Sequence, residues 1–374
     1  MKTYRKIRAV ISGGGTGGHI FPAVSIANAL MEANPDNEIL FVGAEGRMEM
    51  EKVPAAGYKI VGLPIRGLQR KLSISNLKVP FKVLSSLKKA GAIIDDFKPD
   101  VAIGVGGYAS APLLWKATAK GVPSLIQEQN GFAGLTNKML GSRVGCICVA
   151  YEGMERFFPK EKIVFSGNPI RSVIHPYSEA EKAEGLRYYG MDPAKKHILV
   201  VGGSLGSGTL NSSMKGWIEA GCPGGEDVEV LWQCGKYYKK GIDEFAAKLG
   251  RLPEGIKYTD FIARMDLAYA MADVVISRSG ASSVSEICAA GKAAVFVPSP
   301  NVAEDHQTHN AMALVRKGAA LIIKDSEARE KLLPEAVSLL ADDAKRASVE
   351  AAAAAMAKMD AAEVIVDEIY KLLK

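Results

Sequence analysis

The stretch from Gly13 to Gly18 contains five glycines in six positions, and it directly follows an apolar run at 7–11. Glycine loses more backbone freedom on folding than any other residue, so such a run is costly unless bare backbone is needed. Unpaired N–H groups at the start of a helix carry partial positive charge, and glycines let a phosphate come within hydrogen-bonding distance of them. We therefore expect a strand, a phosphate-sized glycine loop and a helix here.

Short apolar runs alternate with amphipathic stretches along the whole chain. The runs are nearly continuous, which is typical of parallel strands buried on both faces. Strands are expected at 6–11, 38–42, 100–105, 123–127, 145–149 and 162–165 in the first half, and at 196–201, 228–232, 274–277 and 294–297 in the second. The amphipathic stretches between them, such as 22–34, complete βα repeats.

The βα pattern pauses near 167–176 and restarts with a second apolar run and glycine loop. A chain of 374 residues suits about two domains. We predict the α/β fold class, with two Rossmann-like doubly wound domains at 1–170 and 171–357. The alanine-rich run near the C-terminus favours a crossing helix, and the last helix, about 358–374, is expected to pack back on the first domain.

Composition argues against several classes of protein. Apolar residues make up 48% and charged residues 24% of the chain, as in an ordinary globular protein. The formal net charge of +6 is too small to indicate a nucleic-acid partner. No signal peptide or apolar run of about 18 to 20 residues is found, so any membrane contact is expected from the surface. The five scattered cysteines favour a reducing cytosol, and Cys146 and Cys148 are interpreted as core residues.

Two further glycine loops follow predicted strands, at 104–107 and 202–206. The first loop, from Gly13 to Gly18, also fits the dinucleotide pattern G-x-G-x-x-G, with Glu45 as the acid that such a site needs. A dehydrogenase is therefore one alternative. That alternative gives no role to His19 beside the first loop, or to the polar residues at 279–286 and 304–310 in the second half.

Several polar residues are candidates for catalysis or ligand binding. His19 is either a general base, because a neutral imidazole accepts a proton near pH 7, or a histidine that caps or packs against its helix. The small residues 279–283 precede a helix with Glu286, which either accepts two ribose hydroxyls or caps the helix. His306 and His309 share a polar loop, and because no other histidine or cysteine pattern supports a metal site, this loop favours sugar hydroxyls.

Six motifs in a fixed order carry a specific resemblance: GGGTGGHIFPA, QEQNGFAGLTNK, GNPIR, GGSLGSGTLN, SRSGASSVSEI and EDHQTHNA. Together they resemble the MurG family of bacterial N-acetylglucosaminyltransferases, from the first strand to the last helix. The resemblance implies a GT-B glycosyltransferase, whose two domains face a deep cleft. It also implies UDP-N-acetylglucosamine as donor and lipid I, the undecaprenyl-diphosphate-linked muramyl pentapeptide, as acceptor, with no cofactor.

The same resemblance implies roles for individual residues. His19 matches the proposed base. The substrate contacts carried over by motif are Thr16, Gly17, Gly18, Asn130, Arg171, Ser204, Ile262, Ser282, Glu286 and Gln307. Within this set, Ile262 is expected to meet uracil through its backbone, and Glu286 to bind the ribose. Asn130 and Gln307 are expected at the donor sugar.

The reaction implied by the resemblance needs a way to neutralise the departing UDP. Many transferases use a metal ion held by an Asp-x-Asp motif, which this chain lacks, so no metal site is predicted. The glycine loops, the helix N-termini and Arg171 are expected to stabilise the developing negative charge instead. His19 would deprotonate the muramyl 4-hydroxyl as it attacks, and a single displacement would invert the anomeric centre from α to β.

A basic and apolar stretch indicates a membrane-facing surface. From Lys52 to Ile94 the chain has nine basic residues and no acidic one. Such a stretch suits anionic lipid headgroups, although part of it must pack on the domain. The expected contacts are Leu77, Phe81, Leu84, Lys78, Lys82 and Trp115. We therefore expect a peripheral protein at the cytoplasmic face of the bacterial cell membrane.

Two alternatives share much of this pattern. A UDP-sugar 2-epimerase would have the same two-domain fold, but it needs additional acid–base residues and no lipid-facing basic stretch. A non-catalytic nucleotide-sugar-binding module would hold the donor without transferring the sugar. The sequence leaves both alternatives open.

Overall fold

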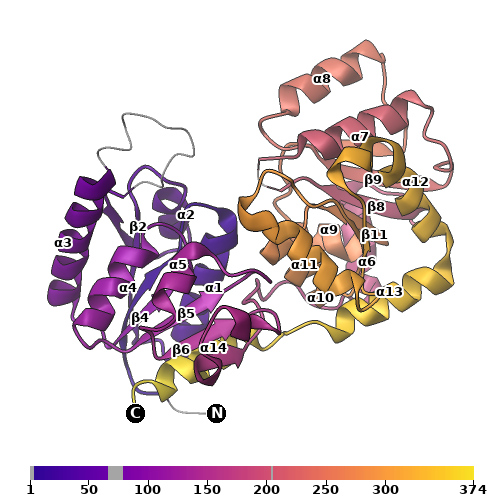
Figure 1. Cartoon of the computed structure of the whole chain (residues 1–374). Coiled ribbons are helices and arrows are strands. Elements are labelled where there is room, and N and C mark those ends of the chain that lie inside the picture. The colour runs from indigo at the N-terminus through magenta and orange to yellow at the C-terminus, as the bar shows by residue number, and fades with distance from the viewer. Residues whose placement is uncertain (1–3, 66–78, 204) are drawn as a thin grey trace. The chain divides into compact units, whose positions relative to one another are not determined.

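The chain forms two compact units, each built on one parallel sheet (Figure 1). The structure is a computed structural model that describes residues 4–65, 79–203 and 205–374. The first unit comprises Met1–Arg171 together with Lys358–Lys374, and the second comprises Ser172–Ala357.

The first unit has a seven-stranded parallel sheet in the order β3-β2-β1-β4-β5-β6-β7. Its strands are β1 (Arg8–Ser12), β2 (Glu38–Ala44), β3 (Lys59–Leu63), β4 (Val101–Gly104), β5 (Ser124–Glu128), β6 (Cys146–Val149) and β7 (Ile163–Phe165). Its helices are α1 (Gly17–Ala33), α2 (Glu49–Ala55), α3 (Val79–Phe97), α4 (Ser110–Ala119), α5 (Leu135–Leu140) and α14 (Ala361–Lys371), with short 3-10 turns at Met154–Arg156 and Lys160–Lys162.

The second unit has a six-stranded parallel sheet in the order β10-β9-β8-β11-β12-β13. Its strands are β8 (Lys196–Val201), β9 (Val228–Gln233), β10 (Ile256–Thr259), β11 (Val274–Ser277), β12 (Ala293–Phe296) and β13 (Leu321–Ile322). Its helices are α6 (Glu179–Tyr189), α7 (Gly208–Glu219), α8 (Lys239–Lys248), α9 (Met265–Met271), α10 (Ala281–Ala289), α11 (His306–Val315), α12 (Ala328–Ala341) and α13 (Asp343–Ala355), with 3-10 turns at Ala303–Asp305 and Asp325–Glu327.

The central strands are buried on both faces, which explains their continuous apolar runs. In β1, Ala9 and Ile11 belong to one hydrophobic cluster, whereas Val10 between them belongs to another. Because successive side chains point to opposite faces of a strand, both faces of the sheet are covered. All ten predicted strands are present, and the prediction of two Rossmann-like parallel-sheet units is confirmed.

Three strands, β3, β10 and β13, are not predicted from the sequence. Each lies at an edge of its sheet. Lys59 at the start of β3 is exposed, and β13 is only two residues long. An edge strand is covered less completely than a central one, so its sequence does not need the continuous apolar run by which the other strands were recognised.

In both sheets the strand order reverses at the first strand, so that later strands are added on its other side. In the first unit β1 pairs with β2 on one side and with β4 on the other, and in the second unit β8 lies between β9 and β11. In open α/β sheets, ligands bind outside the carboxyl ends of the strands at such a switch point. The loops that follow β1, β4, β8 and β11 are therefore where a site is expected in each unit.

The last helix, α14, packs in the core of the first unit, although it is far from the other helices of that unit in sequence. Ile365 and Ile369 are fully buried in the hydrophobic cluster that also contains the first strand. The rings of Tyr4 and Tyr370 stack with their centroids 4.3 Å apart. The Asn37 amide also donates a hydrogen bond of 3.1 Å to the Tyr370 hydroxyl. These contacts tie the C-terminal segment to strand β1 and its neighbours.

A partly buried ion pair closes the amino end of the second sheet. The Asp273 carboxylate accepts hydrogen bonds from the Lys182 ammonium at 2.6 Å and from the His197 backbone N–H at 2.9 Å. Burial raises the pKa of the Asp273 carboxyl, but the hydrogen bonds from His197 and Lys182 outweigh it and hold that pKa well below its usual range. The pair lies at the amino ends of the strands, whereas the glycine loops follow the carboxyl ends. We therefore assign it a role in stability and not in ligand binding.

Replacing this carboxylate tests its contribution to stability. We expect Asp273→Asn to lower the free energy of unfolding at pH 7 by about 2 kcal/mol, because the variant leaves partly buried donors poorly paired. The pKa is depressed in the folded state, so the stabilisation is present above the unfolded value of about 3.9 and is lost as the pH falls further. Urea unfolding at pH 7 and pH 3.5 should show the gap to the wild type shrinking. Asp343→Asn, at an exposed carboxylate paired with Lys196, is the control; an equal effect of both changes would contradict this account.

Candidate active site

The loops after β1 and β4 touch each other through glycines. A Cβ on Gly107 would lie 2.4 Å from the carbonyl oxygen of Gly14, and the backbone of Gly107 has a φ of +91°. The Gly14 N–H also donates a hydrogen bond of 3.4 Å to the carbonyl of Gly106. Only glycine combines this close approach with a left-handed backbone. The two predicted glycine loops of the first unit therefore form one surface at the switch point.

His19 lies in the first turn of α1 and is held by the glycine loop. Its Nδ1 lies 3.0 Å from the carbonyl oxygen of Gly14 and 3.3 Å from the hydroxyl of Thr16, the residue that precedes the helix. A carbonyl can only accept, so Nδ1 carries the hydrogen and Nε2 carries the lone pair. The ring packs on the loop at 104–107, because a Cβ on Gly106 would lie 2.9 Å from Nε2. The nitrogen that can act as a base thus lies at the junction of the two loops.

A buried carboxylate without a recognisable sequence motif lies beneath the glycine loop of the first unit. Glu49, at the start of α2, is fully buried and accepts hydrogen bonds from the N–H groups of Gly15 at 2.9 Å and Ala44 at 3.0 Å. Gly14 and Gly43 leave the space for it, since a Cβ on either would lie within 2.6 Å of its side chain. The sequence gives no signal for Glu49, because a glutamate in the first turn of a helix is common on surfaces.

Asn130 follows β5 and is held by another buried carboxylate. The Oε1 atom of Glu128 accepts hydrogen bonds from the side-chain amide of Asn130 at 3.2 Å and from its backbone N–H at 3.1 Å. Asn168 lies beside this segment, because its amide donates to the carbonyl of Gln129 at 3.0 Å. The structure therefore joins the QEQN and GNPIR motifs and places the half-buried Arg171 three residues beyond that junction.

The second glycine loop is held by a neutral side chain. The Gln233 amide oxygen accepts from the Gly202 N–H at 2.9 Å, and its NH₂ group donates to the carbonyls of Gly203 at 2.9 Å and Asp260 at 3.1 Å. Gln233 thus links this loop to the segment that carries Ile262. The side chain of Ile262 is buried, so a ligand would meet its backbone. Ser204, predicted within this loop, lies outside the described residues.

The segment from the end of β11 into the first turn of α10 contains hydroxyl groups without a hydrogen-bond partner among the described residues. The Oγ atoms of Ser279 and Ser282 are buried and have no hydrogen-bond partner in the part of the chain that the structure describes. Glu286, on the same helix as Ser282, is buried, and its Oε2 accepts from the hydroxyl of Tyr269 at 3.3 Å. Buried polar groups normally have partners, so these serines are candidates to face a ligand.

Gln307 belongs to α11, after an irregular loop. Its side-chain oxygen accepts from the backbone N–H of Ser299 at 2.9 Å, which leaves its NH₂ group as the part that can donate elsewhere. Glu304 and Asp305, just before the helix, have left-handed backbones with φ of 51° and 50°. Such conformations in residues other than glycine store strain and are typical of functional loops.

The described site residues share one location in each unit. His19, Asn130 and Arg171 follow the carboxyl ends of β1, β5 and β7 in the first unit. Ile262, Ser282 and Gln307 follow the carboxyl ends of β10, β11 and β12 in the second. Among the described residues, no group of three or more His, Cys, Asp and Glu side chains is arranged to hold a metal ion.

The structure describes four of the six predicted membrane contacts, namely Phe81, Lys82, Leu84 and Trp115. Phe81 and Leu84 on α3 are 78% and 72% exposed, and Trp115 on α4 is partly exposed with the Arg143 guanidinium 3.7 Å from its ring centroid. Lys82, on the same helix as Phe81, is half-buried. Leu77 and Lys78 lie outside the described residues. In the described part of the chain, every helix falls short of the length and apolar character that crossing a membrane requires.

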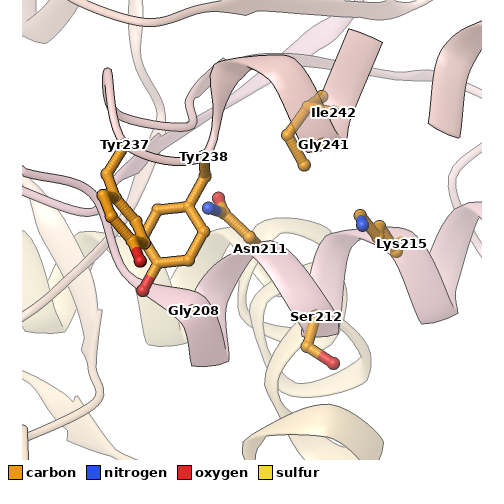
Figure 2. Close-up of a pocket in the computed structure, with 8 residues that line it drawn as sticks. All are labelled: Gly208, Asn211, Ser212, Lys215, Tyr237, Tyr238, Gly241 and Ile242. Carbon is orange, nitrogen blue, oxygen red and sulfur yellow. The ribbon is translucent and has the colours of Figure 1, made fainter. Parts of the chain in front are cut away.

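An open pocket of about 320 Å³ lies between α7 and α8, and its lining contains none of the described site residues (Figure 2). It is lined by Gly208, Asn211, Ser212, Lys215, Tyr237, Tyr238, Gly241 and Ile242. Figure 2 shows the rings of Tyr237 and Tyr238 near the start of α7. A Cβ on Gly208 would lie 3.1 Å from the Tyr238 hydroxyl, so this tyrosine supports the helix start that follows the second glycine loop.

Comparison with known proteins places the chain in a family. Residues 9–149 match the glycosyltransferase family 28 N-terminal domain, and residues 197–366 match its C-terminal domain. A solved structure of Acinetobacter baumannii MurG has a TM-score of 0.77 and 29% identity, and the match covers 98% of this chain and 99% of that one. The "UDP-N-acetylglucosamine--N-acetylmuramyl-(pentapeptide) pyrophosphoryl-undecaprenol N-acetylglucosamine transferase" of Parabacteroides distasonis is 53% identical over 369 residues, covering 99% of both chains. This chain belongs to the MurG family of glycosyltransferases.

Other similarities agree with membership in the MurG family. A protein of the same name from Cytophaga hutchinsonii is 51% identical over 374 residues, covering 100% of this chain and 99% of that protein. A UDP-N-acetylglucosamine 2-epimerase has a TM-score of 0.67 at 15% identity, covering 97% of this chain and 95% of that one, so it shares the fold alone. The resemblance drawn from the six motifs is confirmed, and the dehydrogenase alternative is left without support.

Proposed function

We infer that this enzyme transfers N-acetylglucosamine from UDP-N-acetylglucosamine to the 4-hydroxyl of the muramyl sugar of lipid I, forming lipid II for peptidoglycan synthesis. The observation that carries this inference is the similarity, over nearly the whole chain, to relatives that bear the name of this activity. The two Rossmann-like units with glycine loops at both switch points support it, because a nucleotide diphosphate binds at such places.

His19 is proposed as the base of the reaction. The hydrogen bond from Nδ1–H to the carbonyl of Gly14 fixes the tautomer in which Nε2 can accept a proton. The acceptor oxygen loses this proton to Nε2 while it forms a bond to the anomeric carbon. The bond between that carbon and the UDP oxygen breaks on the opposite face, so the configuration inverts from α to β.

The remaining site residues are proposed to bind substrate and leaving group. The second unit, Ser172–Ala357, would hold UDP-N-acetylglucosamine, with Glu286 on the ribose, the Ile262 backbone on the uracil, and Gln307 on the sugar. The first unit, Met1–Arg171 with Lys358–Lys374, would receive the acceptor. The neutral Gln233 beneath the second glycine loop supports this division, since that loop adds no negative charge beside a diphosphate.

Further substrate contacts follow from the motifs. Thr16, Gly17 and Gly18 at the start of α1, and Ser282 with its buried hydroxyl, are proposed to contact diphosphate or sugar oxygens. Arg171 would balance the charge of the departing UDP. Fixed dipoles and one cation, aimed at developing charge, can carry out this task without a metal ion.

Transfer of radiolabelled N-acetylglucosamine from the UDP donor to a short-chain lipid I analogue tests the proposal. We expect labelled lipid II in the presence or absence of a chelator. Epimerisation of the donor in reactions that lack acceptor would favour a 2-epimerase. Binding of the donor by calorimetry without any transfer would favour a non-catalytic module. Either outcome would overturn the proposed function.

We also propose peripheral contact with the cytoplasmic face of the membrane through α3. Phe81 and Leu84 are highly exposed on this helix, and Lys88 nearby is exposed as well. An amphipathic cationic helix binds anionic lipid by burying its apolar side chains near the headgroups. The proposed acceptor is anchored in the membrane by its lipid tail, so an enzyme bound to the membrane surface would reach it there.

The double variant Phe81→Ser with Leu84→Glu should bind anionic vesicles at least about 10-fold more weakly, because it removes two exposed apolar side chains that would enter the lipid and adds a negative charge. Cosedimentation with phosphatidylglycerol vesicles measures the change, and circular dichroism checks the fold. Tyr237→Ser, at an aromatic side chain that is 82% exposed in the second unit, is the matched control. Unchanged vesicle binding by the double variant would count against this surface.

A further inference from the structure

One peptide unit connects the buried Glu49 to His19. The N–H of the Gly14–Gly15 peptide, which belongs to Gly15, donates to Glu49 Oε2 at 2.9 Å. The C=O of the same peptide, which belongs to Gly14, accepts from His19 Nδ1–H at 3.0 Å. Because a peptide unit is planar and rigid, its two ends cannot turn independently. The carboxylate and the imidazole therefore fix each other's hydrogen bonds.

The surroundings hold Glu49 in place for this contact. The side chain is fully buried, and its second oxygen accepts from the N–H of Ala44 at 3.0 Å at the end of β2. Gly14 and Gly43 lack the side chains that would collide with it. The Gly15 N–H points to this carboxylate, so it is used inside the protein rather than presented to a phosphate.

We propose that Glu49 is a positioning residue for His19, acting through the Gly14–Gly15 peptide. A negative charge at the N–H end polarises the peptide and makes its carbonyl a stronger acceptor, because hydrogen bonds in a chain strengthen one another. The stronger acceptor keeps the ring in the tautomer that has its hydrogen on Nδ1 and its lone pair on Nε2. It also stabilises the positive ring that forms when Nε2 takes the proton. This inference rests on the proposed role of His19 as the base.

A double-mutant cycle separates this role from simple support of the loop. We expect Glu49→Gln to lower kcat by about 10- to 10²-fold, which is less than the loss expected for the base itself. The KM for UDP-N-acetylglucosamine should change little. In a His19→Ala background, adding Glu49→Gln should change the residual turnover by less than about threefold, because the group through which Glu49 acts is absent.

The outcomes of this cycle distinguish two failures. If His19→Ala lowers turnover strongly and Glu49→Gln adds its full effect to it, Glu49 only supports the loop and the inference is overturned, while the proposed function stands. If His19→Ala retains turnover within tenfold of the wild type, the base assignment falls and this inference with it. Wild-type turnover in Glu49→Gln alone also overturns the inference.

Three further measurements guard against a folding defect. Glu51→Gln removes an exposed carboxylate from the same helix, and it should leave turnover and thermal unfolding unchanged. Glu49→Asp keeps the charge on a shorter side chain, so it should recover part of the turnover lost in Glu49→Gln. The acid limb of the pH profile of kcat/KM should move to lower pH in Glu49→Gln and less in Glu49→Asp. A profile that stays in place in both variants contradicts the inference.

Discussion

Alanine in place of His19 is expected to lower turnover by about 10² to 10⁴-fold, the range that a positioned general base contributes. The structure supports the base role through geometry. Nδ1 lies 3.0 Å from the carbonyl of Gly14 and must donate to it, so Nε2 carries the lone pair. Without the imidazole to take its proton, the muramyl hydroxyl would attack while still protonated, and the barrier to sugar transfer would rise.

The measurement is the initial rate of transfer to a soluble lipid I analogue at saturating donor. Affinity for UDP, measured by calorimetry, should stay near the wild-type value, because the nucleotide is assigned to the second unit. His175→Ala is the control, since His175 lies in the second unit and pairs with Glu181 on α6. A loss below tenfold in His19→Ala would remove this residue from the role of base.

The sequence predicts the centre of each sheet well and its edges poorly, for one physical reason. A central strand such as β11 is buried on both faces, so all four of its residues from Val274 to Ser277 are buried and most are apolar. The edge strand β10 contains Lys257 and Thr259, which are only partly buried. A strand covered on one side has fewer demands on its sequence, so its pattern resembles that of a loop.

Some residues of the candidate site can be placed from the local sequence, whereas others are placed only by contacts between distant parts of the chain. The glycine loops and His19 could be placed from the sequence, because a strand, a glycine run and a helix are consecutive there. Glu49 and Gln233 could not, since each acts on a loop that is at least 30 residues away in the chain. Such contacts become visible only when the strand order is known.

These two residues make the two glycine loops electrostatically different. The loop of the first unit lies over the carboxylate of Glu49, whereas the loop of the second unit lies over the neutral amide of Gln233. A carboxylate repels a diphosphate in a partly buried site, where charges are screened less than in water. The difference favours the second unit's loop as the main binding place for the donor diphosphate, whereas the peptide between Gly14 and Gly15 in the first unit's loop orients His19.

The other large effect is expected at Glu286. A ribose presents two adjacent hydroxyl donors, and a carboxylate can accept both. Glu286 is buried on α10, and the Tyr269 hydroxyl, which donates to its Oε2 at 3.3 Å, holds it in position. In Glu286→Gln one acceptor becomes an NH₂ donor that faces a hydroxyl, and the charge that strengthens both hydrogen bonds is lost. Each charge-assisted hydrogen bond contributes about 1.5 to 3 kcal/mol.

We therefore expect the Kd for UDP and the KM for UDP-N-acetylglucosamine to rise by about 10²-fold in Glu286→Gln, with a smaller change in kcat. A comparison of UDP with 2′-deoxyuridine diphosphate makes the test specific. The wild type should lose affinity when the 2′-hydroxyl is absent, whereas the variant should bind both nucleotides almost equally. Tyr269→Phe, which removes only the supporting hydroxyl, should cost less than tenfold. If Glu286→Gln binds UDP as tightly as the wild type, the ribose is bound elsewhere, because a buried carboxylate in contact with two hydroxyls cannot be neutralised without loss of affinity.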